Sequence, residues 1–305
     1  MPIVIPKNLP ANKFLQKENI FVMNESRAYH QDIRTLEILI LNIMPSKIET
    51  ENQLLRVLAN SPLQVNVTLL KTASYVPKNI AETHMNQFYT TFDKIKNREF
   101  DGMIITGAPV ENIDFNQVEY YKELKKIMLF SKESVTSTIH ICWGAQVGLH
   151  YHFGIKKFFA KRKISGIYKH KVLQKNHPLM RGIDDVFYAP HSRYTYNNLD
   201  DLRSLKNIII LATSSEAGLY MATTKDMKQI FIAGHPEYSF DTIKNEYERD
   251  LEKGLNPKIP KNYFENDDPK GKIIMNWRSH SHLFFSNWIN YAVYQETPYI
   301  LKGKR

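Results

Sequence analysis

Apolar runs of β-type sequence recur along this chain, and amphipathic stretches separate them. The first run covers residues 35–42 and precedes a helical pattern over residues 49–58. Later runs cover residues 65–70, 101–106, 207–212 and the stretches just before 142 and 235. Buried strands alternating with helices are typical of a mostly parallel sheet covered on both faces. We therefore expect an α/β fold whose ligands bind beyond the carboxyl ends of the strands.

The chain is expected to form one large domain. Its 305 residues are 43% hydrophobic, which is enough for a sizeable core, and no internal repeat, low-complexity segment or Pro/Gly/Ser-rich linker divides them. We place a single α/β domain at residues 35–298, with an N-terminal extension (1–34) and a C-terminal tail (299–305). The more irregular region from about 156 to 203 predicts an insertion of β-hairpin and loop structure that shapes the pocket.

The only cysteine, Cys142, stands between an apolar strand-like run and a helix-like run. The small Gly144 and Ala145 allow a tight turn with the thiol at its tip, as a nucleophile elbow requires. A helix that begins there points backbone N–H groups at the sulfur and favours the thiolate. The alternative is a buried cysteine that acts as a small hydrophobe.

A second apolar strand ends in His235-Pro236-Glu237. In an extended segment, residues two apart project to the same side, and Pro236 keeps the preceding residue extended. We therefore expect the carboxylate of Glu237 to orient the imidazole of His235. With the thiol of Cys142, these groups are the parts of a nucleophilic triad.

Charge and cysteine content exclude several other classes of protein. The formal net charge is +10, and residues 156–163 are the densest basic run, but lysine is spread along the whole chain and no nucleic-acid motif accompanies it. We expect a solvated surface that binds no nucleic acid, with a phosphate-bearing coenzyme as the next candidate ligand. No run approaches the about 20 apolar residues of a membrane span, and residues 1–7 lack the apolar core of a signal peptide. A single cysteine excludes an intrachain disulfide and a multi-thiolate zinc site, so we expect no metal site and a reducing cytoplasm.

Five motifs spread over nearly the full length resemble those of the homoserine O-acyltransferases. They lie at residues 42–47, 50–53, 106–111, 140–146 and 234–238. The Cys-x-Gly-x-Gln and His-Pro-Glu patterns are also similar to those of the triad glutamine amidotransferases. The resemblance implies a flavodoxin-like three-layer sandwich of the class I glutamine amidotransferase type. It also implies the first reaction of the methionine branch, transfer of an acyl group from acyl-coenzyme A to the hydroxyl of L-homoserine.

This reaction fits the chemistry of the candidate triad. Cys142 would attack the thioester, and His235, held by Glu237, would then take the proton from the homoserine hydroxyl. A covalent intermediate implies ping-pong kinetics, with the acyl-coenzyme A as co-substrate and no bound cofactor. The backbone N–H of Trp143 is a candidate donor to the oxyanion. A second donor would come from residues 107–108 or from near Lys47.

The resemblance further implies substrate contacts at Lys163, Ser192 and Arg249. Arg249 is suited to clamp the carboxylate of the amino acid through two hydrogen bonds. The alternative for Arg249 is a surface residue that pairs with Glu246 on its own helix. The alternatives for Ser192 and Lys163 are an ordinary turn serine and a solvated lysine.

Glu111 bears on the choice of acyl donor. In the family that the chain resembles, Gly at this position goes with succinyl transfer and Glu with acetyl transfer. Two like charges about 4 Å apart, at an effective dielectric of about 20, repel by about 4 kcal/mol, which disfavours a succinyl carboxylate. We therefore expect acetyl-CoA as the donor, unless Glu111 is an exposed loop carboxylate without effect.

Three other functions stay open from the sequence. They are homoserine O-succinyl transfer, a glutaminase-type amidotransferase that uses the same triad, and a basic protein that binds nucleic acid. A homodimer is the default expectation for a metabolic enzyme.

Overall fold

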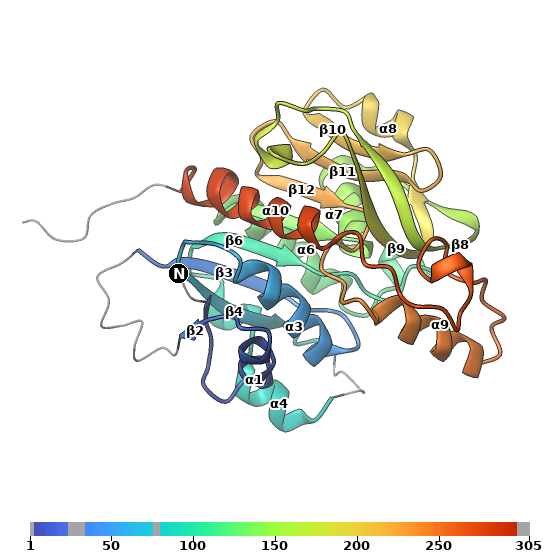
Figure 1. Ribbon diagram of the computed structural model, residues 1–305. Helices are drawn as coiled ribbons and strands as arrows, with labels where there is room; N and C mark the ends of the chain where they lie inside the picture. The colour runs from blue at the N-terminus through green and yellow to red at the C-terminus, as the bar shows by residue number, and fades with distance from the viewer. Residues whose placement is uncertain (1–2, 24–33, 76–79, 298–305) are drawn as a thin grey trace, which may run out of the picture.

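The computed structural model describes residues 3–23, 34–75 and 80–297, and its centre is one large sheet (Figure 1). The parallel part of the sheet is, in spatial order, β2 (Val22–Met23), β1 (Ile3–Val4), β4 (Val65–Lys71), β3 (Leu36–Leu41), β6 (Phe100–Ile105), β7 (Val135–Ile141) and β12 (Gln229–Ile232). The antiparallel part continues with β11 (Gly218–Thr224), β10 (Ile208–Ser214), β8 (Lys157–Val172) and β9 (Val186–Asn197). A short strand, β5 (Tyr89–Thr91), lies beside β4.

Helices cover both faces of the parallel part. Along β3, Ile38 and Ile40 belong to one buried cluster, and Leu39 and Leu41 to another, because successive side chains point to opposite faces. The first face is covered by α3 (Lys47–Leu58), α10 (Arg278–Asn287) and the π-helical segment η4 (Trp288–Tyr294), and the second by α6 (Tyr121–Glu133) and α7 (Trp143–Phe153). The three layers confirm the predicted α/β sandwich with its mostly parallel sheet.

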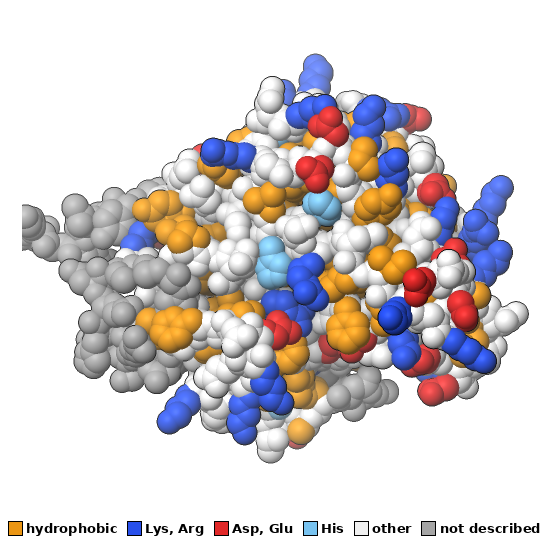
Figure 2. All heavy atoms as spheres, viewed as in Figure 1, with side chains coloured by type: hydrophobic (Ala, Val, Ile, Leu, Met, Phe, Trp, Pro, Cys, Tyr) orange, Lys and Arg blue, Asp and Glu red, His pale blue; other side chains and the backbone are white. Residues whose placement is uncertain are grey.

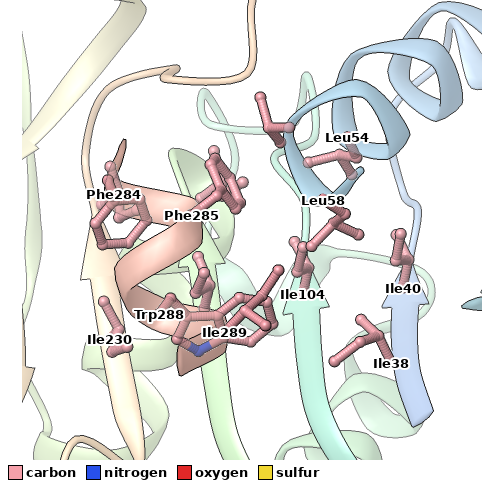
Figure 3. Close-up of a cluster of buried hydrophobic side chains, with 14 of the residues drawn as sticks. Ile38, Ile40, Leu54, Leu58, Ile104, Ile230, Phe284, Phe285, Trp288 and Ile289 are labelled. Carbon is pink, nitrogen blue, oxygen red and sulfur yellow. The ribbon is translucent and has the colours of Figure 1, made fainter. Parts of the chain in front are cut away.

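The C-terminal helices are fixed to the sheet by large apolar side chains. Figure 3 shows Trp288 and Ile289 lying against Ile104, with Leu54 and Leu58 of α3 beside them. Each of these side chains is buried, and such a side chain contributes about 1.5–3 kcal/mol relative to an exposed one. This packing holds the parallel strands whose carboxyl ends carry the candidate triad.

The predicted insertion is a long antiparallel hairpin of β8 and β9, and it is more regular than its sequence suggests. The paired residues run from Lys157 with Asn197 to Lys171 with Val186, with one register shift between Phe159 and Ile164. Within β8, His170 is buried, whereas Lys169 and Lys171 are exposed. The alternation of a strand is present, but its inward positions include polar residues.

The described part of the expected N-terminal extension lies at the edge of the sheet. β1 pairs with β4, and α1 (Pro10–Lys17) packs against α3. Residues 1–2 and 24–33 of the extension, and the expected tail at 299–305, lie outside the described residues. The domain limits stay a prediction.

The remaining elements either connect strands or, as α9 and η3 do, follow the last strand. They are α4 (Glu82–Phe88), α5 (Phe92–Ile95), η1 (Phe115–Gln117), η2 (Pro178–Met180), α8 (Leu199–Arg203), α9 (Thr242–Glu252) and η3 (Glu265–Asp267). Of the helices in the described ranges, none has the length and apolar character needed to cross a membrane. On the face in Figure 2, Lys and Arg side chains are dispersed among acidic and apolar ones.

Candidate active site

A sharp turn joins β7 to α7 at Cys142. Cys142 has φ 52° and ψ −115°, a backbone conformation that non-glycine residues rarely adopt and that is often found at active sites. A Cβ at Gly144 would lie 2.7 Å from the carbonyl oxygen of Thr106, so only glycine fits there. The structure thus has the elbow that the sequence predicts, with Cys142 8% exposed.

The thiol and the imidazole meet beside the loop that follows β6. The backbone N–H of Cys142 donates to the carbonyl of Ile232 at 2.7 Å, which ties the elbow to β12. A Cβ placed on Gly107 would lie 3.3 Å from Cβ of Cys142 and 3.7 Å from Cε1 of His235. The charge of Cys142 also acts on the imidazole of His235. Two residues 93 positions apart in the printed sequence are therefore neighbours here.

His235 and Glu237 meet as expected, but through a turn. Nδ1 of His235 lies 2.7 Å from Oε1 of Glu237. Pro236 and Glu237 form a turn in which the N–H of Tyr238 donates to the carbonyl of His235, so the segment does not continue extended from β12. Proline suits this turn because its φ is already fixed. The Tyr238 ring stacks on the imidazole with centroids 4.1 Å apart.

The charges of the triad favour an imidazolium. Burial alone lowers the pKa of His235, but the negative charges of Cys142 and Glu237 outweigh burial and raise this pKa well above its ordinary value. The second carboxylate oxygen of Glu237 has no hydrogen-bond partner among the described residues. The negative charge of Glu237 also acts on Tyr220 and Tyr238, whose pKa values it raises.

Two of the expected substrate-contact residues share one carboxylate. Nζ of Lys163, on β8, lies 2.7 Å from Oδ2 of Asp250, and Nη2 of Arg249 lies 2.9 Å from Oδ1 of the same residue. Asp250 is buried, whereas the Arg249 side chain is 50% exposed. The ion-pair partner of Arg249 is thus Asp250, its neighbour on α9, and not Glu246. The two cations form a positive pair whose exposed member can take an anionic group of a ligand.

Ser192, on β9, is linked to the triad through Glu246. Its hydroxyl donates to Oε2 of Glu246 at 2.5 Å, and the hydroxyl of Tyr238 donates to Oε1 at 2.8 Å. Since Tyr238 stacks on His235, the hydroxyl of Ser192 is three contacts from the imidazole, with Glu246 and Tyr238 between them. Ser192 lies in a strand and not in a turn, and its role stays a prediction.

Glu111 is fixed against the hairpin. Its Oε2 accepts hydrogen bonds from the backbone N–H of Tyr194 at 2.8 Å and of Thr195 at 3.0 Å, and from the Thr195 hydroxyl at 2.8 Å. The same hydroxyl lies 2.9 Å from Oε1 of Gln146 on α7, although its single proton serves one acceptor at a time. Glu111 is thus a positioned carboxylate and not a free loop residue.

The two auxiliary candidates lie at helix starts. Trp143 is the first residue of α7, where a backbone N–H has no acceptor within the helix. Lys47 begins α3 and is 5% exposed, and its Nζ donates to the carbonyl of Asn42 at 2.5 Å. Burial lowers the pKa of Lys47 to about 8, against the opposing effect of Glu51.

Other features bound what the site can do. In the ranges that the structure describes, no group of three or more His, Cys, Asp or Glu side chains could hold a metal ion. A groove of about 960 Å³ borders Glu237 and Tyr238, but neither Cys142 nor His235 lines it. This groove therefore does not open onto the thiol or the imidazole of the triad.

The sequence analysis missed one residue of this neighbourhood. Arg193 follows Ser192 on β9 and is 1% exposed, the most deeply buried arginine among the described residues. The only feature of the sequence that could have indicated Arg193 is its place at an inward position of β9, where buried and exposed residues alternate.

Comparisons with known proteins agree with the site. The family model described as Homoserine O-succinyltransferase matches residues 2–299. A relative named Homoserine O-acetyltransferase 1, from Ilyobacter polytropus, is 57% identical over 99% of this chain and 100% of its own length. Relatives named Homoserine O-acetyltransferase from Petrotoga mobilis and Bacillus cereus are each 54% identical over 99% of this chain and cover 97% and 100% of their own lengths.

A solved structure extends the likeness of fold. A glutamine amidotransferase from Thermotoga maritima matches 85% of this chain and 98% of its own with a TM-score of 0.55, at 11% identity. The expected class I glutamine amidotransferase fold is therefore confirmed. Because the family model covers nearly the whole sequence, the chain belongs to the homoserine O-succinyltransferase family of acyltransferases.

Proposed function

We propose that this protein transfers the acetyl group of acetyl-CoA to the hydroxyl of L-homoserine and so makes O-acetyl-L-homoserine for methionine biosynthesis. The observation that carries this proposal is the meeting of Cys142, His235 and Glu237 at the ends of β7 and β12. It is supported by the names of full-length relatives at 54–57% identity.

The reaction would take two steps on one sulfur. In the first, the anionic sulfur of Cys142 attacks the thioester carbonyl, the C–S bond to coenzyme A breaks, and the imidazolium of His235 gives its proton to the departing thiolate. In the second, the hydroxyl of homoserine attacks acetyl-Cys142 while His235 takes its proton, and Cys142 leaves as an anion. Glu237 holds the ring so that Nε2 faces the reacting atoms, because Nδ1 is bonded to the carboxylate.

Both tetrahedral intermediates need donors for their oxyanion. The backbone N–H of Trp143 follows the nucleophile directly, and the loop at Gly107 lies against both Cys142 and His235. We assign these two positions to the oxyanion hole, where one donor is worth about 3–4 kcal/mol of barrier. Lys47 would act beside them, since an amine with a pKa of about 8 can exchange a proton near neutral pH.

Homoserine would bind between α9 and the hairpin. Its carboxylate matches Arg249 and Lys163, which Asp250 holds in place. Ser192 and Glu246 lie between this cation pair and the triad, so they would contact the amino-acid backbone or the hydroxyl arm.

Glu111 supports acetyl over succinyl. Donors of Tyr194 and Thr195 hold its Oε2 as a fixed acceptor. A succinyl carboxylate on the sulfur would therefore approach a like charge that cannot swing away. The coenzyme is consumed as a co-substrate, and a reducing cytoplasm would keep Cys142 reduced.

The decisive experiment is intact-mass analysis after rapid mixing with acetyl-CoA or succinyl-CoA. We expect one acetyl adduct, absent from Cys142→Ser, that disappears when L-homoserine is added as O-acetyl-L-homoserine forms. A succinyl adduct that forms faster than the acetyl one would reassign the donor. Absence of any adduct, with release of ammonia from glutamine, would support a glutaminase instead.

A further inference from the structure

Arg193 is a buried cation without a carboxylate partner. Its guanidinium donates to three neutral acceptors: the carbonyl of Thr195 at 2.7 Å, Nδ1 of His191 at 3.4 Å, and the carbonyl of Ala217. Across residues 3–23, 34–75 and 80–297, no ion pair includes Arg193. A fully buried charge costs several kcal/mol unless an opposite charge compensates it. The compensating anion must therefore belong to the site itself.

The position of Arg193 on β9 places it between the two sides of the triad. Pro190, three residues earlier, accepts the backbone N–H of His235 at 2.9 Å. Thr195, two residues later, contacts Gln146, whose own N–H donates to the carbonyl of Cys142. The strand that carries Arg193 thus touches the His235 loop at one end and the Cys142 elbow at the other.

The charges that act on Arg193 agree with this placement. Burial lowers the pKa of Arg193, and the groups that oppose this effect are, largest first, Cys142 and Glu111, followed by the phenol of Tyr168. His191 contacts the guanidinium and His170 contacts His191, and burial together with the charge of Arg193 lowers the pKa of each histidine. Among the groups that raise the pKa of Arg193, Cys142 therefore has the largest effect.

We propose that Arg193 is a positioning residue that supplies a fixed positive charge to the sulfur of Cys142 and to the carboxylate of Glu111, and that it keeps the nucleophile anionic between acyl transfers. The role rests on the proposed function, but it concerns the free enzyme and needs neither acyl donor nor acceptor. Its three bonds to neutral acceptors fix the guanidinium in place without neutralising its charge.

Alkylation tests this role directly, because Cys142 is the only cysteine. The rate of carboxamidomethylation by iodoacetamide is followed by intact mass as a function of pH, and it rises as the anionic sulfur forms. The titratable and charged groups that are coupled electrostatically to Cys142 are His235, Tyr238 and Arg193, and Glu237 acts through His235. The reagent uses no part of the acyltransfer reaction, so failure of the proposed function leaves the test intact.

Two variants separate charge from structure. Arg193→Met removes the charge, and Arg193→Lys keeps it, but both lose the paired bonds to the Thr195 and Ala217 carbonyls. In Arg193→Met, we expect the midpoint of the alkylation profile to rise by about one pH unit or more. Below the midpoint, the alkylation rate at a given pH should then fall about tenfold. In Arg193→Lys, the midpoint should rise by much less. Arg56→Met, on α3, is the control for loss of an arginine elsewhere.

Equal midpoints in wild type, Arg193→Met and Arg193→Lys would overturn the proposal, whatever their thermal stabilities. Equal upward shifts in the two variants would also overturn it, since the bonds and not the charge would then matter. If Arg193→Met does not fold, Arg193→Gln takes its place with the same expectation, because its amide can still donate to one of the two carbonyls.

Discussion

The parallel and antiparallel halves of the sheet hold different residues of the candidate site. In the parallel half, Cys142 directly follows β7, and His235 lies three residues after the end of β12. The backbone N–H of Cys142 donates to Ile232 of β12, and the backbone N–H of His235 donates to Pro190 of β9. In the antiparallel half, Lys163 and Ser192 project from a long hairpin and meet partners on α9, where Arg249 is half exposed. The comparison teaches that backbone hydrogen bonds of the sheet hold the bond-making groups, whereas side-chain contacts between the hairpin and α9 hold the groups proposed to recognise substrate.

The largest expected effect tests this division in the parallel half. Cys142→Ser should lower kcat by at least about 10⁴-fold, since a neutral hydroxyl replaces the anionic sulfur. Ser192→Ala, its counterpart in the hairpin, should cost about tenfold, the worth of one hydrogen bond. Steady-state assays with acetyl-CoA and homoserine measure both. Comparable losses in the two variants would break the division.

Glu111 follows β6 of the parallel half and is bonded to β9 of the antiparallel half. Two substitutions distinguish the effect of its charge from the effect of its volume. Glu111→Gln keeps an oxygen to accept the Tyr194 and Thr195 donors but removes the charge, whereas Glu111→Gly also opens space. Removing about 4 kcal/mol of repulsion should raise succinyl-CoA use relative to acetyl-CoA by up to several hundred-fold in kcat/KM. If only Glu111→Gly changes the preference, volume rather than charge sets it.

A substitution of Arg249 tests whether the groups on α9 and the hairpin bind homoserine. Arg249→Gln should raise KM for homoserine by about 10–100-fold, because a charge-assisted bond to the carboxylate is lost, and should change kcat much less. The first half-reaction, acetylation of Cys142, should proceed at the wild-type rate. A slow first half-reaction would move Arg249 from homoserine to the acyl donor.

The smallest effect concerns stability in acid. Burial lowers the pKa of His140, on β7, and of His170, on β8, to about 3 each. Between the ordinary value of 6.5 and 3 the unfolded chain binds more protons, so the free energy of unfolding should fall as the pH falls, by up to about 1.4 kcal/mol per pH unit for each histidine. Urea unfolding of wild type, His140→Phe and His170→Gln measures the slope. Unchanged slopes in both variants would show that neither histidine is responsible.

The sequence predicts the parallel half well and the antiparallel half poorly, for a physical reason. A buried parallel strand is a continuous apolar run, and Cys142 and His235 stand where such runs end. The hairpin is an antiparallel ribbon whose inward positions hold His170, His191 and Arg193, so hydrophobicity does not reveal its alternation.

Contacts between residues far apart in the sequence were the other feature that could not be predicted. That Asp250 holds both Lys163 and Arg249 depends on α9 reaching the hairpin, which no spacing in the sequence shows. The bond between His235 and Glu237 was predictable because the two residues are local, although the turn that brings them together was not the expected extended segment.

The attachment of residues 111–113 to the hairpin has a consequence for engineering. Lys157 of β8 donates to the carbonyls of Glu111 and Ile113 at 2.6 Å each, while β9 holds the Glu111 carboxylate. A chimera that exchanges this loop alone between relatives would separate it from both anchors. To transfer the preference for an acyl donor between relatives, the loop and the β8–β9 hairpin should therefore be exchanged together. Directed evolution toward new acyl donors should likewise randomise the loop and the hairpin together.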